Sequence, residues 1–452
     1  MILRRILIAN RGEIAVRVIR TCQRLGIETV LAASEADLDS MAARLADSTI
    51  CIGPANSSAS YLNIEAVVAA GVVCKADAVH PGYGFLSENQ KFAEACNRAG
   101  VIFIGPTVAQ LDAVGDKLKA RRHAAVAGLP RVPGGEVRSL DEAQRLADQI
   151  GRPILLKAVG GGGGRGMKQV HDASKLSAAM EIAIAEAQAS FGDPRLYLER
   201  FISHGRHIEV QILGDGEDVI HLGTRDCSIQ RRYQKLVEEA PAPNISETLR
   251  EEMDRAAVAF ARHLNYRGLG TVEFLVDCDR DTFYFLEMNA RIQVEHPVTE
   301  AICGLDLVEE QIAVAEGRKL RYAQGDIKFF GHAIECRINA EDWTHDFRPS
   351  PGKVARVVFP AGQGIRVDTH IQAGTTVTAY YDSLLGKLIV HGANRADALQ
   401  KMRRALSNFE ISGVATNLPM HSALMRSDEF LRGGVNTAFL QQFLQNGNME
   451  AA

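Results

Sequence analysis

Residues 271–297 read TVEFLVDCDRDTFYFLEMNARIQVEHP and carry the strongest structural signal in the chain. Two β-rich runs, residues 271–276 and 283–288, flank a five-residue loop of turn-forming character. Pairing Asp277 with Phe283 across this loop places Glu273 opposite Glu287 on one face. The segment therefore predicts an antiparallel hairpin with two acidic side chains side by side.

The two glutamates of this hairpin need a neutralising partner. At about 5 Å and an effective dielectric constant near 20, two carboxylates repel by roughly 3 kcal/mol, which is a large cost for an incidental pair. A hard divalent cation such as Mg²⁺ prefers oxygen ligands and can complete its shell with phosphates. The pair therefore predicts a metal site next to a phosphorylated ligand.

Polar residues continue at every second position beyond the hairpin. Alternate side chains of an extended chain share one face. The residues placed on that face are Glu287, Asn289, Arg291, Gln293 and Glu295. An ordinary amphipathic edge strand with a solvated face is one interpretation. We favour a binding site, because a solvated face seldom needs two amides and a cation beside a carboxylate pair.

Five consecutive glycines occupy residues 160–164, between Lys157 and Arg165. Such a run loses more backbone entropy on ordering than other sequences, which indicates a specific requirement for it. Backbone N–H groups in a glycine-rich turn can approach phosphate oxygens closely, and the flanking cations can neutralise phosphate charge. No Gly-Lys-Ser/Thr follows, so the run is not a Walker loop. A simple hairpin tip is the alternative; we favour a lid over phosphates.

Other candidate residues are weaker when each is taken alone. Residues 230–235, QRRYQK, could form a cationic strand for an anionic substrate, or a surface charge run balanced by the two glutamates that follow. His207 precedes a short β-rich run, and a lone histidine of this kind is more often structural than catalytic. Cys227 lacks the sequence signature of a nucleophile, so we expect an inert thiol.

The first hundred residues alternate β-rich runs with a helical pattern, which predicts βαβ units around a parallel sheet. The expected elements are strands at 6–9, 29–33 and 101–104 and a helix at 14–25. Residues 80–87, HPGYGFLS, follow a strand at an edge where open α/β sheets bind ligands, although a structural turn is equally compatible.

A run of prolines and glycines near residue 130 predicts a boundary before a small α+β subdomain. Its expected elements are helices at 140–150 and 173–190 and strands at 153–158 and 196–201. From residue 209 the sequence becomes strand-rich, with one long helix at 247–264.

Length and composition indicate a folded chain of about three domains, with 452 residues, 46% apolar and 23% charged. A formal net charge of −4 provides no polybasic field for nucleic acid or an anionic membrane. Neither a secretory signal nor an apolar run of about 18 residues is visible. The eight cysteines form no Cys-x-x-Cys pair, so we expect free thiols and a cytoplasmic location.

Taken together, six motifs in this order resemble biotin carboxylase, the ATP-grasp component of biotin-dependent carboxylases. They are residues 8–15, 80–89, 157–167, 225–235, 287–297 and 335–342. The resemblance implies an α/β chain with the ATP-grasp fold: an N-terminal α/β pre-ATP-grasp domain, a small α+β lid and a C-terminal α+β domain. The expected boundaries are 1–114, a linker at 115–130, the lid at 131–202 and the C-terminal part at 203–446.

The same resemblance assigns roles to individual residues. ATP, the nucleotide cofactor, would be bound by Lys117, Lys157, Gly162, Gly163, Gly164, Glu199, Ile202, His207 and Gln230. Mg²⁺ or Mn²⁺ would be held by Glu273, Glu287 and Asn289. Bicarbonate would be positioned by Lys235, Arg291, Gln293 and Val294, with Glu295 as the base. Biotin, a carrier-bound substrate, would meet Arg337, Tyr83 and Asp382.

The resemblance also implies the reaction. Bicarbonate would attack the γ-phosphate of ATP to form carboxyphosphate, which would decompose to CO₂ and phosphate. That phosphate would remove the N1 proton of biotin, and Arg337 would stabilise the ureido enolate as a permanent cation. One departure from the family pattern is Tyr233, where a nucleotide-contacting His is usual, so no role is carried over there.

Partners follow from the same comparison. No Ala-Met-Lys-Met motif occurs in the chain, which predicts a separate biotin carboxyl carrier protein together with carboxyltransferase subunits. Acetyl-CoA carboxylase, which acts in fatty acid biosynthesis, is the favoured parent; pyruvate, propionyl-CoA and urea carboxylases stay open. A homodimer is expected with Arg20 and Arg366 at the interface, where Arg24 and Gln363 replace familiar residues.

Two rival functions are weighed against this one. Another ATP-grasp ligase, joining a carboxylate to an amine, would not need the motifs at 287–297 and 335–342. A catalytically silent nucleotide-binding partner would not need the intact set of Lys235, Arg291, Glu295 and Arg337.

Overall fold

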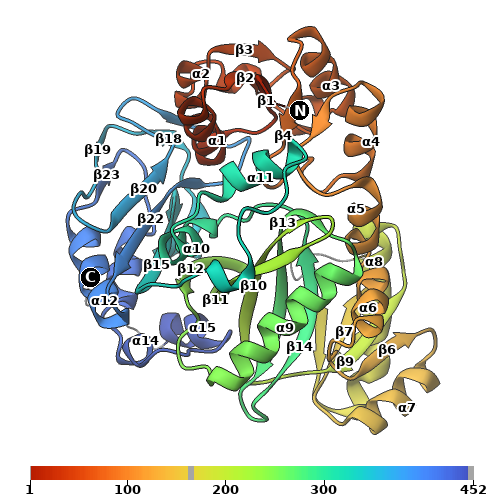
Figure 1. Ribbon diagram of the computed structural model, residues 1–452. Coiled ribbons are helices and arrows are strands. Elements are labelled where there is room, and N and C mark those ends of the chain that lie inside the picture. The colour runs from red at the N-terminus through yellow and green to blue at the C-terminus, as the bar shows by residue number, and fades with distance from the viewer. Residues whose placement is uncertain (1, 161–166, 446–452) are drawn as a thin grey trace.

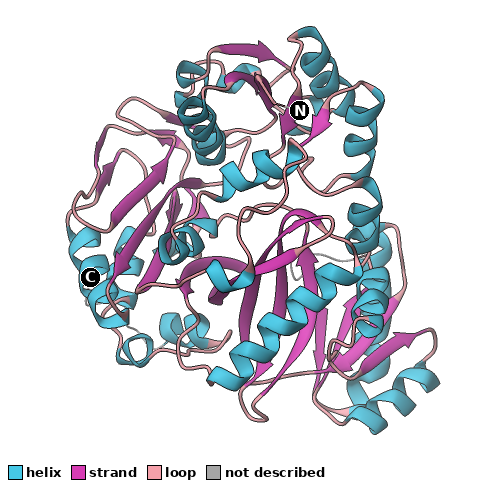
Figure 2. Ribbon diagram, viewed as in Figure 1, coloured by secondary structure: helices cyan, strands magenta, loops and turns pink. Residues whose placement is uncertain are grey.

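The computed structural model describes residues 2–160 and 167–445 (Figure 1). An N-terminal parallel sheet, a small antiparallel sheet and a large antiparallel sheet succeed one another along the chain. Helices lie against each of the three sheets (Figure 2). The α/β fold class predicted from the sequence is confirmed.

The N-terminal sheet has five parallel strands with β1 at its centre. In spatial order they are β3 (Ser48–Cys51), β2 (Glu28–Ala33), β1 (Arg5–Ile8), β4 (Ala78–His80) and β5 (Ile102–Phe103). The helices of this part are α1 (Gly12–Leu25), α2 (Met41–Leu45), α3 (Ile64–Val73) and α4 (Gln90–Arg98). The predicted strands and helix here are confirmed, with ends that shift by one or two residues.

Two consecutive helices, α5 (Val108–Gly115) and α6 (Lys117–Val126), connect this sheet to the next. Asp116 caps α6, because its side chain accepts a hydrogen bond from the Lys119 N–H. The cap fixes Lys117 as the first residue of the helix, and the helix then orients its side chain.

The second sheet is a small antiparallel unit with its own hydrophobic core. Its strands are β6 (Gly134–Val137), β9 (Leu196–Arg200), β7 (Ile154–Ala158) and β8 (Met167–Val170). The helices α7 (Leu140–Ile150) and α8 (Leu176–Phe191) belong to the same unit. Gly162, Gly163 and Gly164, predicted to cover phosphates, lie outside the described residues.

The third sheet has eight antiparallel strands and carries most of the predicted site. In spatial order they are β14 (Thr282–Asn289), β13 (Arg267–Asp277), β10 (Gly205–Asp215), β11 (Val219–Arg231), β12 (Gln234–Ala240), β15 (His332–Asn339), β22 (Leu384–Gly392) and β20 (Ile365–Thr369). Helix α9 (Glu247–His263) packs on β10 and β11, and α12 (Arg395–Ser407) packs on β15 and β22.

Short elements complete the described chain. The helices are α10 (His296–Cys303), α11 (Leu307–Ala315), α13 (Leu418–Leu424), α14 (Asp428–Arg432) and α15 (Phe439–Gln445). Three strand pairs join β16 (Glu341–Asp342) to β17 (Arg348–Pro349), β18 (Gly352–Lys353) to β21 (Thr376–Val377), and β19 (Arg356–Val358) to β23 (Glu410–Ser412).

The β13–β14 hairpin differs from its prediction at the tip. Asp277 pairs with Thr282 rather than with Phe283, so the predicted pairing was wrong. A β-bulge next to Glu273 then places one extra residue, Leu286, on β14. The bulge restores the register, and the predicted placement of Glu273 opposite Glu287 is confirmed.

The polar face predicted as one extended strand is interrupted. Strand β14 ends at Asn289, and helix α10 begins at His296 with Pro297 in its first turn. Glu295 occupies the N-cap position of that helix. The last three residues of the predicted face therefore reach the site from irregular backbone, not by strand alternation.

All eight cysteines are free thiols in the structure. Among the described residues, no helix has the length and apolar character needed to cross a membrane.

Candidate active site

A row of acidic side chains crosses three neighbouring strands of the large sheet. The register pairs Glu209 on β10 with Glu273 on β13, and Glu273 with Glu287 on β14. On its other side Glu209 lies opposite Arg225 of β11. Directly opposite residues on adjacent strands share a face, so the sheet brings these charges together.

Two cations, the buried Arg225 and the largely shielded Lys235, neutralise part of this row. Arg225 is fully buried and donates from Nε to Glu209 Oε1 at 2.5 Å, and its other nitrogens bond Gln211, Thr271, Gln293 and Thr299. Lys235 Nζ donates to Glu209 Oε2 at 2.5 Å and to Glu273 Oε1 at 2.9 Å. A buried ion is stable only when paired and hydrogen-bonded, and both cations meet this condition.

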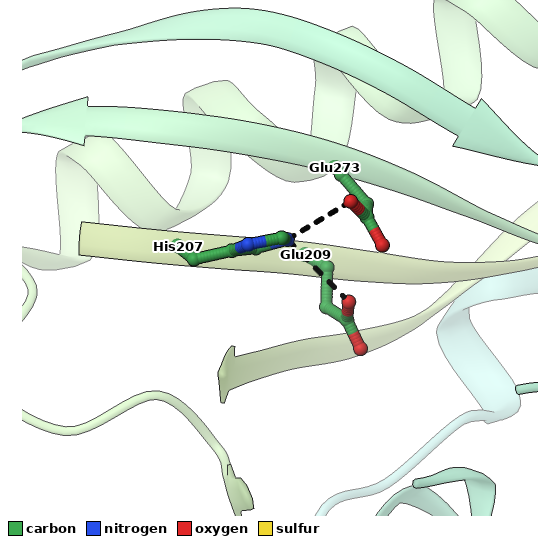
Figure 3. A group of neighbouring side chains, drawn as sticks. All are labelled: His207, Glu209 and Glu273. Atoms are coloured by element: carbon green, nitrogen blue, oxygen red, sulfur yellow. Dashed lines mark ion pairs between the residues drawn. The ribbon is translucent and has the colours of Figure 1, made fainter. Parts of the chain in front are cut away.

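His207 joins the same acidic row, as Figure 3 shows. Its Nε2 lies 3.0 Å from Glu273 Oε2 and 3.9 Å from Glu209 Oε2, while its Nδ1 lies 2.8 Å from Gln230 Nε2. Burial opposes protonation, but Glu273 outweighs it and raises the pKa of His207. The predicted nucleotide residues His207 and Gln230 are thus in contact with one another, and His207 also contacts Glu273, a predicted metal ligand.

The three predicted metal ligands differ in how they are held. Glu273 accepts hydrogen bonds from Asn289 at 2.8 Å and Gln293 at 3.0 Å, and Lys235 and His207 together hold its pKa well below the usual range despite its burial. Within the described residues, no hydrogen bond or ion pair reaches the carboxylate of Glu287. Burial, with the Glu273 charge next, raises the pKa of Glu287.

This donor set fits a hard divalent cation. Carboxylate and amide oxygens are the ligands that Mg²⁺ and Mn²⁺ prefer. The uncompensated carboxylate of Glu287 beside Glu273 is the feature that a bound cation would satisfy.

The predicted phosphate cations come from two other elements. Burial lowers the pKa of Lys117 at the start of α6, and the nearby Glu287 charge offsets part of this effect. Lys157 on β7 forms an ion pair with Glu199 on β9, and Ile202 is buried just beyond that strand. Lys157, Glu199 and Ile202 thus belong to the small antiparallel unit, and Lys117 lies electrostatically close to Glu287, one of the predicted metal ligands.

Glu295 lies between two cations. Its Oε1 accepts from Lys235 Nζ at 2.6 Å, and its Oε2 accepts from Arg337 Nη2 at 2.9 Å. Burial would raise the pKa of Glu295, but Lys235 and Arg337 hold it well below the usual range. Arg291 approaches from the same loop, with Nη2 donating to Asn289 Oδ1 at 2.9 Å and Nε to Glu88 at 2.8 Å. The arrangement is an ionised carboxylate next to fixed positive charges.

The three predicted biotin residues differ in their contacts and in their exposure. Arg337 donates from Nε to Glu238 Oε1 at 2.6 Å, and burial raises the pKa of Glu238 to about 7. The Tyr83 hydroxyl donates to Glu13. Asp382 is exposed, and its Oδ1 accepts from the Leu384 N–H.

Two further residues singled out from the sequence are Tyr233 and Cys227. Tyr233 lies at the tip of the β11–β12 hairpin, with φ of 67° and a side chain that is 58% exposed. Cys227 is buried with its Sγ 4.0 Å from Glu295 Oε1, and burial raises its pKa well above the usual range. A buried protonated thiol agrees with the expectation of an inert cysteine.

Several residues of the site were missed from the sequence. Glu209 and Arg225 complete the charged row, and Glu88, Glu238 and Glu13 hold predicted residues in place. The alternation of His207, Glu209 and Gln211 along one strand is a signal that could have revealed Glu209. Arg225, Glu88 and Glu13 lie within the quoted motifs and Glu238 closely follows one of them, but no local pattern shows which side chain each of them contacts.

Three family models match the chain in succession. They are described as biotin carboxylase, N-terminal domain, over residues 2–111; carbamoyl-phosphate synthase L chain, ATP binding domain, over 116–323; and biotin carboxylase C-terminal domain, over 335–442.

Curated relatives match over nearly their whole length. A biotin carboxylase from Nostoc sp. is 50% identical over 97% of this chain and 98% of its own. One from Pseudomonas aeruginosa is 49% identical over 98% of this chain and 99% of its own. A pyruvate carboxylase subunit from Methanothermobacter thermautotrophicus is 48% identical over 97% of this chain and 90% of its own.

Solved structures agree. A biotin carboxylase from Campylobacter jejuni, in complex with β,γ-ATP, has a TM-score of 0.94 and 46% identity, and the match covers 97% of this chain and 99% of that one. The biotin carboxylase domain dimer of Hydrogenobacter thermophilus 2-oxoglutarate carboxylase, with MgADP, ADP and bicarbonate, has a TM-score of 0.94 and 44% identity over 100% of both chains.

Proposed function

The chain belongs to the biotin carboxylase family, and from this premise we propose that it is the biotin carboxylase subunit of an acetyl-CoA carboxylase. It is an ATP-dependent ligase that uses ATP, Mg²⁺ or Mn²⁺ and biotin as substrate. The observation that carries the proposed site assignments is the position of Glu295 between Lys235 and Arg337.

On the nucleotide side, we assign Lys117 and Lys157 to the phosphates of ATP. Each is a cation next to a carboxylate, Glu287 for Lys117 and Glu199 for Lys157, and its positive charge would attract the phosphate oxygens. Glu199 and Ile202 would line the adenine pocket, and His207 with Gln230 would face the ribose. The assignment of Gly162, Gly163 and Gly164 to the phosphates stays a prediction from the sequence.

Glu273, Glu287 and Asn289 would hold the divalent cation, which when bound neutralises phosphate charge. Lys235 and His207 keep Glu273 ionised in readiness for the ion. Glu287 brings a carboxylate with no other partner in the described chain. These residues therefore supply the charge and the oxygen ligands for a cation.

Bicarbonate would bind against Arg291, Lys235, Gln293 and Val294, with Glu295 accepting its proton. A strongly ionised carboxylate is a weak base, so the step depends on how well the site stabilises the carbonate that forms. Lys235 and Arg291 supply that stabilisation as fixed positive charges. Holding the anion in line with the γ-phosphate makes its attack effectively unimolecular and yields carboxyphosphate and ADP.

Arg337 would stabilise the biotin enolate. Carboxyphosphate decomposes to CO₂ and phosphate, the phosphate takes the biotin N1 proton, and the enolate attacks CO₂ to give carboxybiotin. Arg337 is fixed by Glu238 and Glu295, so its positive charge is aligned before the substrate arrives. Tyr83 and Asp382 would shape the biotin pocket.

The acceptor specificity is the finer part of the proposal. Chains named biotin carboxylase, of matching length and 49–50% identity, support a biotin carboxylase subunit. The choice of acetyl-CoA carboxylase as its parent, with separate carrier and carboxyltransferase proteins, follows from the family resemblance alone. A pyruvate or 2-oxoglutarate carboxylase is the second candidate, favoured by relatives of those names. A cytoplasmic location and a homodimer with Arg20 and Arg366 at its interface stay predictions.

The test is ADP release by the purified chain with bicarbonate, with and without free biotin. We expect slow release with bicarbonate alone and a marked increase with biotin, and no dependence on biotin would contradict the assignment of the site. Reconstitution with carrier and carboxyltransferase proteins from an acetyl-CoA carboxylase or a pyruvate carboxylase then decides the acceptor. Activity only with the pyruvate components would overturn the proposed parent enzyme.

A further inference from the structure

Lys387 is a fully buried lysine in the middle of strand β22, outside the predicted site. On one side of it lies Arg337 of β15, directly opposite in the register, and on the other lies Asp368 of β20. A buried ammonium beside a second cation is costly unless other groups compensate it. The contacts of Lys387 therefore show which groups compensate its buried charge.

One contact of Lys387 leads to the bicarbonate loop. Its Nζ donates to the backbone carbonyl of Val294 at 2.8 Å. Val294 is the residue between Gln293 and Glu295, where the chain turns into helix α10. The lysine therefore fixes the backbone on which the assigned base is carried.

The other contact leads to the assigned biotin side. Nζ lies 3.1 Å from Glu13 Oε1, and that carboxylate also accepts from the Tyr83 hydroxyl. Glu13 belongs to α1 in the N-terminal unit, and this helix packs against β20 and β22. The side chains of Glu13 and Lys387 are almost fully shielded from water, at 1% and 0% exposed. This buried ion pair thus joins α1 of the N-terminal unit to β22 of the large sheet.

We propose that Lys387 and Glu13 are a pair of positioning residues that hold the biotin side of the site, through Tyr83, in register with the bicarbonate side, through the Val294 carbonyl. The proposal rests on the function assigned above, and it adds two residues that would touch neither substrate. Charge compensation by Glu13 also keeps Lys387 from disturbing Arg337 across the strand pair.

The physical basis is the cost of leaving a buried polar group without its partner. Replacing Lys387 by Met removes the only ammonium that reaches the Val294 carbonyl within the described chain and leaves Glu13 with Tyr83 alone. Replacing Glu13 by Gln keeps an acceptor for Tyr83 but removes the carboxylate that forms the ion pair with Lys387. Replacing both removes the charge imbalance, keeps the acceptor for Tyr83, and still leaves Val294 without its donor.

The experiment compares K387M, E13Q and the double variant with the native chain, with K401M as control. Lys401 forms an ion pair with Asp397 on α12 and lies outside the site. The measurements are thermal unfolding, ATP affinity by calorimetry, and the Michaelis constants for free biotin and bicarbonate. We expect K387M to raise both Michaelis constants by about tenfold, the change that a lost buried hydrogen bond gives, with ATP affinity within about twofold.

The double variant separates positioning from general stability. We expect the double variant to recover the native Michaelis constant for biotin and the native unfolding temperature, while its Michaelis constant for bicarbonate stays raised. We expect K401M to match the native chain in all of these measurements. Joint recovery of both constants, unchanged constants in K387M, or failure of both K387M and the double variant to fold would overturn the proposal. A native chain that never responds to biotin would instead overturn the proposed function, which the native control reveals first.

Discussion

Glu295 and Lys235 form an ion pair in which Oε1 and Nζ are 2.6 Å apart, and the second oxygen of the same carboxylate accepts from Arg337. The base assigned to bicarbonate is thus bonded to one cation assigned to bicarbonate and to another assigned to biotin. The Glu295 carboxylate therefore links the residues assigned to bicarbonate with the residue assigned to biotin.

Glu295→Gln keeps the size of the side chain and removes the base. We expect ATP binding by calorimetry within about threefold of native, with bicarbonate-dependent ADP release lowered at least about a hundredfold, in the range of general-base loss. The low pKa of Glu295 means that native turnover should show no acid limb from this group near neutrality. Normal turnover, or ATP affinity lost in step with turnover, would make Glu295 a structural residue.

Arg337→Ala should affect the carboxylation of biotin and the biotin-independent cleavage of ATP to different extents. We expect carboxylation of biotin to fall much more, by about a hundredfold or greater, than biotin-independent ATP cleavage, because Arg337 is assigned to the enolate and Lys235 still holds Glu295. Arg348→Ala, an exposed arginine on β17, is the matched control. Equal losses in the two assays would contradict the division of labour.

Glu273 and Glu287, the two proposed metal carboxylates, should affect catalysis alike when replaced but affect the stability of the fold differently. Glu273→Gln and Glu287→Gln should both abolish ATP cleavage with Mg²⁺ present, since each removes a proposed ligand. Without metal, Glu287→Gln should unfold at or above the native temperature, because it removes a half-buried charge that no hydrogen bond or ion pair of the described residues compensates. Glu273→Gln should lower the free energy of unfolding by about 1–3 kcal/mol, because Lys235 and His207 lose a partner.

Asp281→Asn, on the exposed tip of the same hairpin, serves as the control for both metal-ligand variants. Full ATP cleavage in either variant would remove that residue from the site. Equal stability changes in the two would contradict the difference in how the structure holds them.

Tyr233→His tests the departure from the family pattern. The side chain lies exposed at the β11–β12 tip, so any role must arise when ATP binds. We expect the Michaelis constant for ATP to change by about two- to fivefold and that for bicarbonate to stay constant, a pattern typical of altered ground-state binding to one substrate. A bicarbonate-selective change would place residue 233 on the other side of the site.

The local elements and the central hairpin could be predicted from the sequence because they follow periodicity and turn chemistry. Glu273 was placed opposite Glu287 although the tip pairing was wrong, since the bulge at Leu286 compensated for a loop one residue shorter than expected. Periodicity does not reveal bulges, and it does not reveal where a strand ends. The prediction that the polar face continues as a strand beyond Asn289 was therefore wrong.

The partners that hold the site could not be predicted in the same way. Glu209 meets Glu273 through the pairing of β10 with β13, and Lys387 meets Glu13 through the packing of α1 on β22. Both contacts depend on the topology of the whole chain. The resemblance supplied the residues that contact substrates, whereas only the structure supplied the charges that orient them.

The final prediction concerns stability and pH at Asp254, a buried residue of α9 whose Oδ1 lies 3.4 Å from His221 Nδ1. Burial raises the pKa of Asp254 from 3.8 to about 7 and lowers the pKa of His221 to about 4, so both groups favour their neutral forms in the folded chain. The unfolded chain releases the Asp254 proton near pH 3.8, and the folded chain retains it to a higher pH. Stability from this group is therefore full below about pH 4 and declines as pH rises toward 7.

Asp254→Asn should remove that decline. We expect the variant to gain about 4 kcal/mol in free energy of unfolding at pH 8 relative to native, and to lose most of this advantage at pH 4.5, because the pKa of Asp254 rises from 3.8 to about 7 and each pKa unit corresponds to about 1.4 kcal/mol. Urea unfolding at both pH values measures the difference, with the exposed Glu251→Gln on the same helix as control. A gain that is equal at the two pH values would show that the pKa of Asp254 is not raised in the folded chain, and a loss of stability at pH 4.5 would show that Asp254 is ionised and paired with a protonated His221.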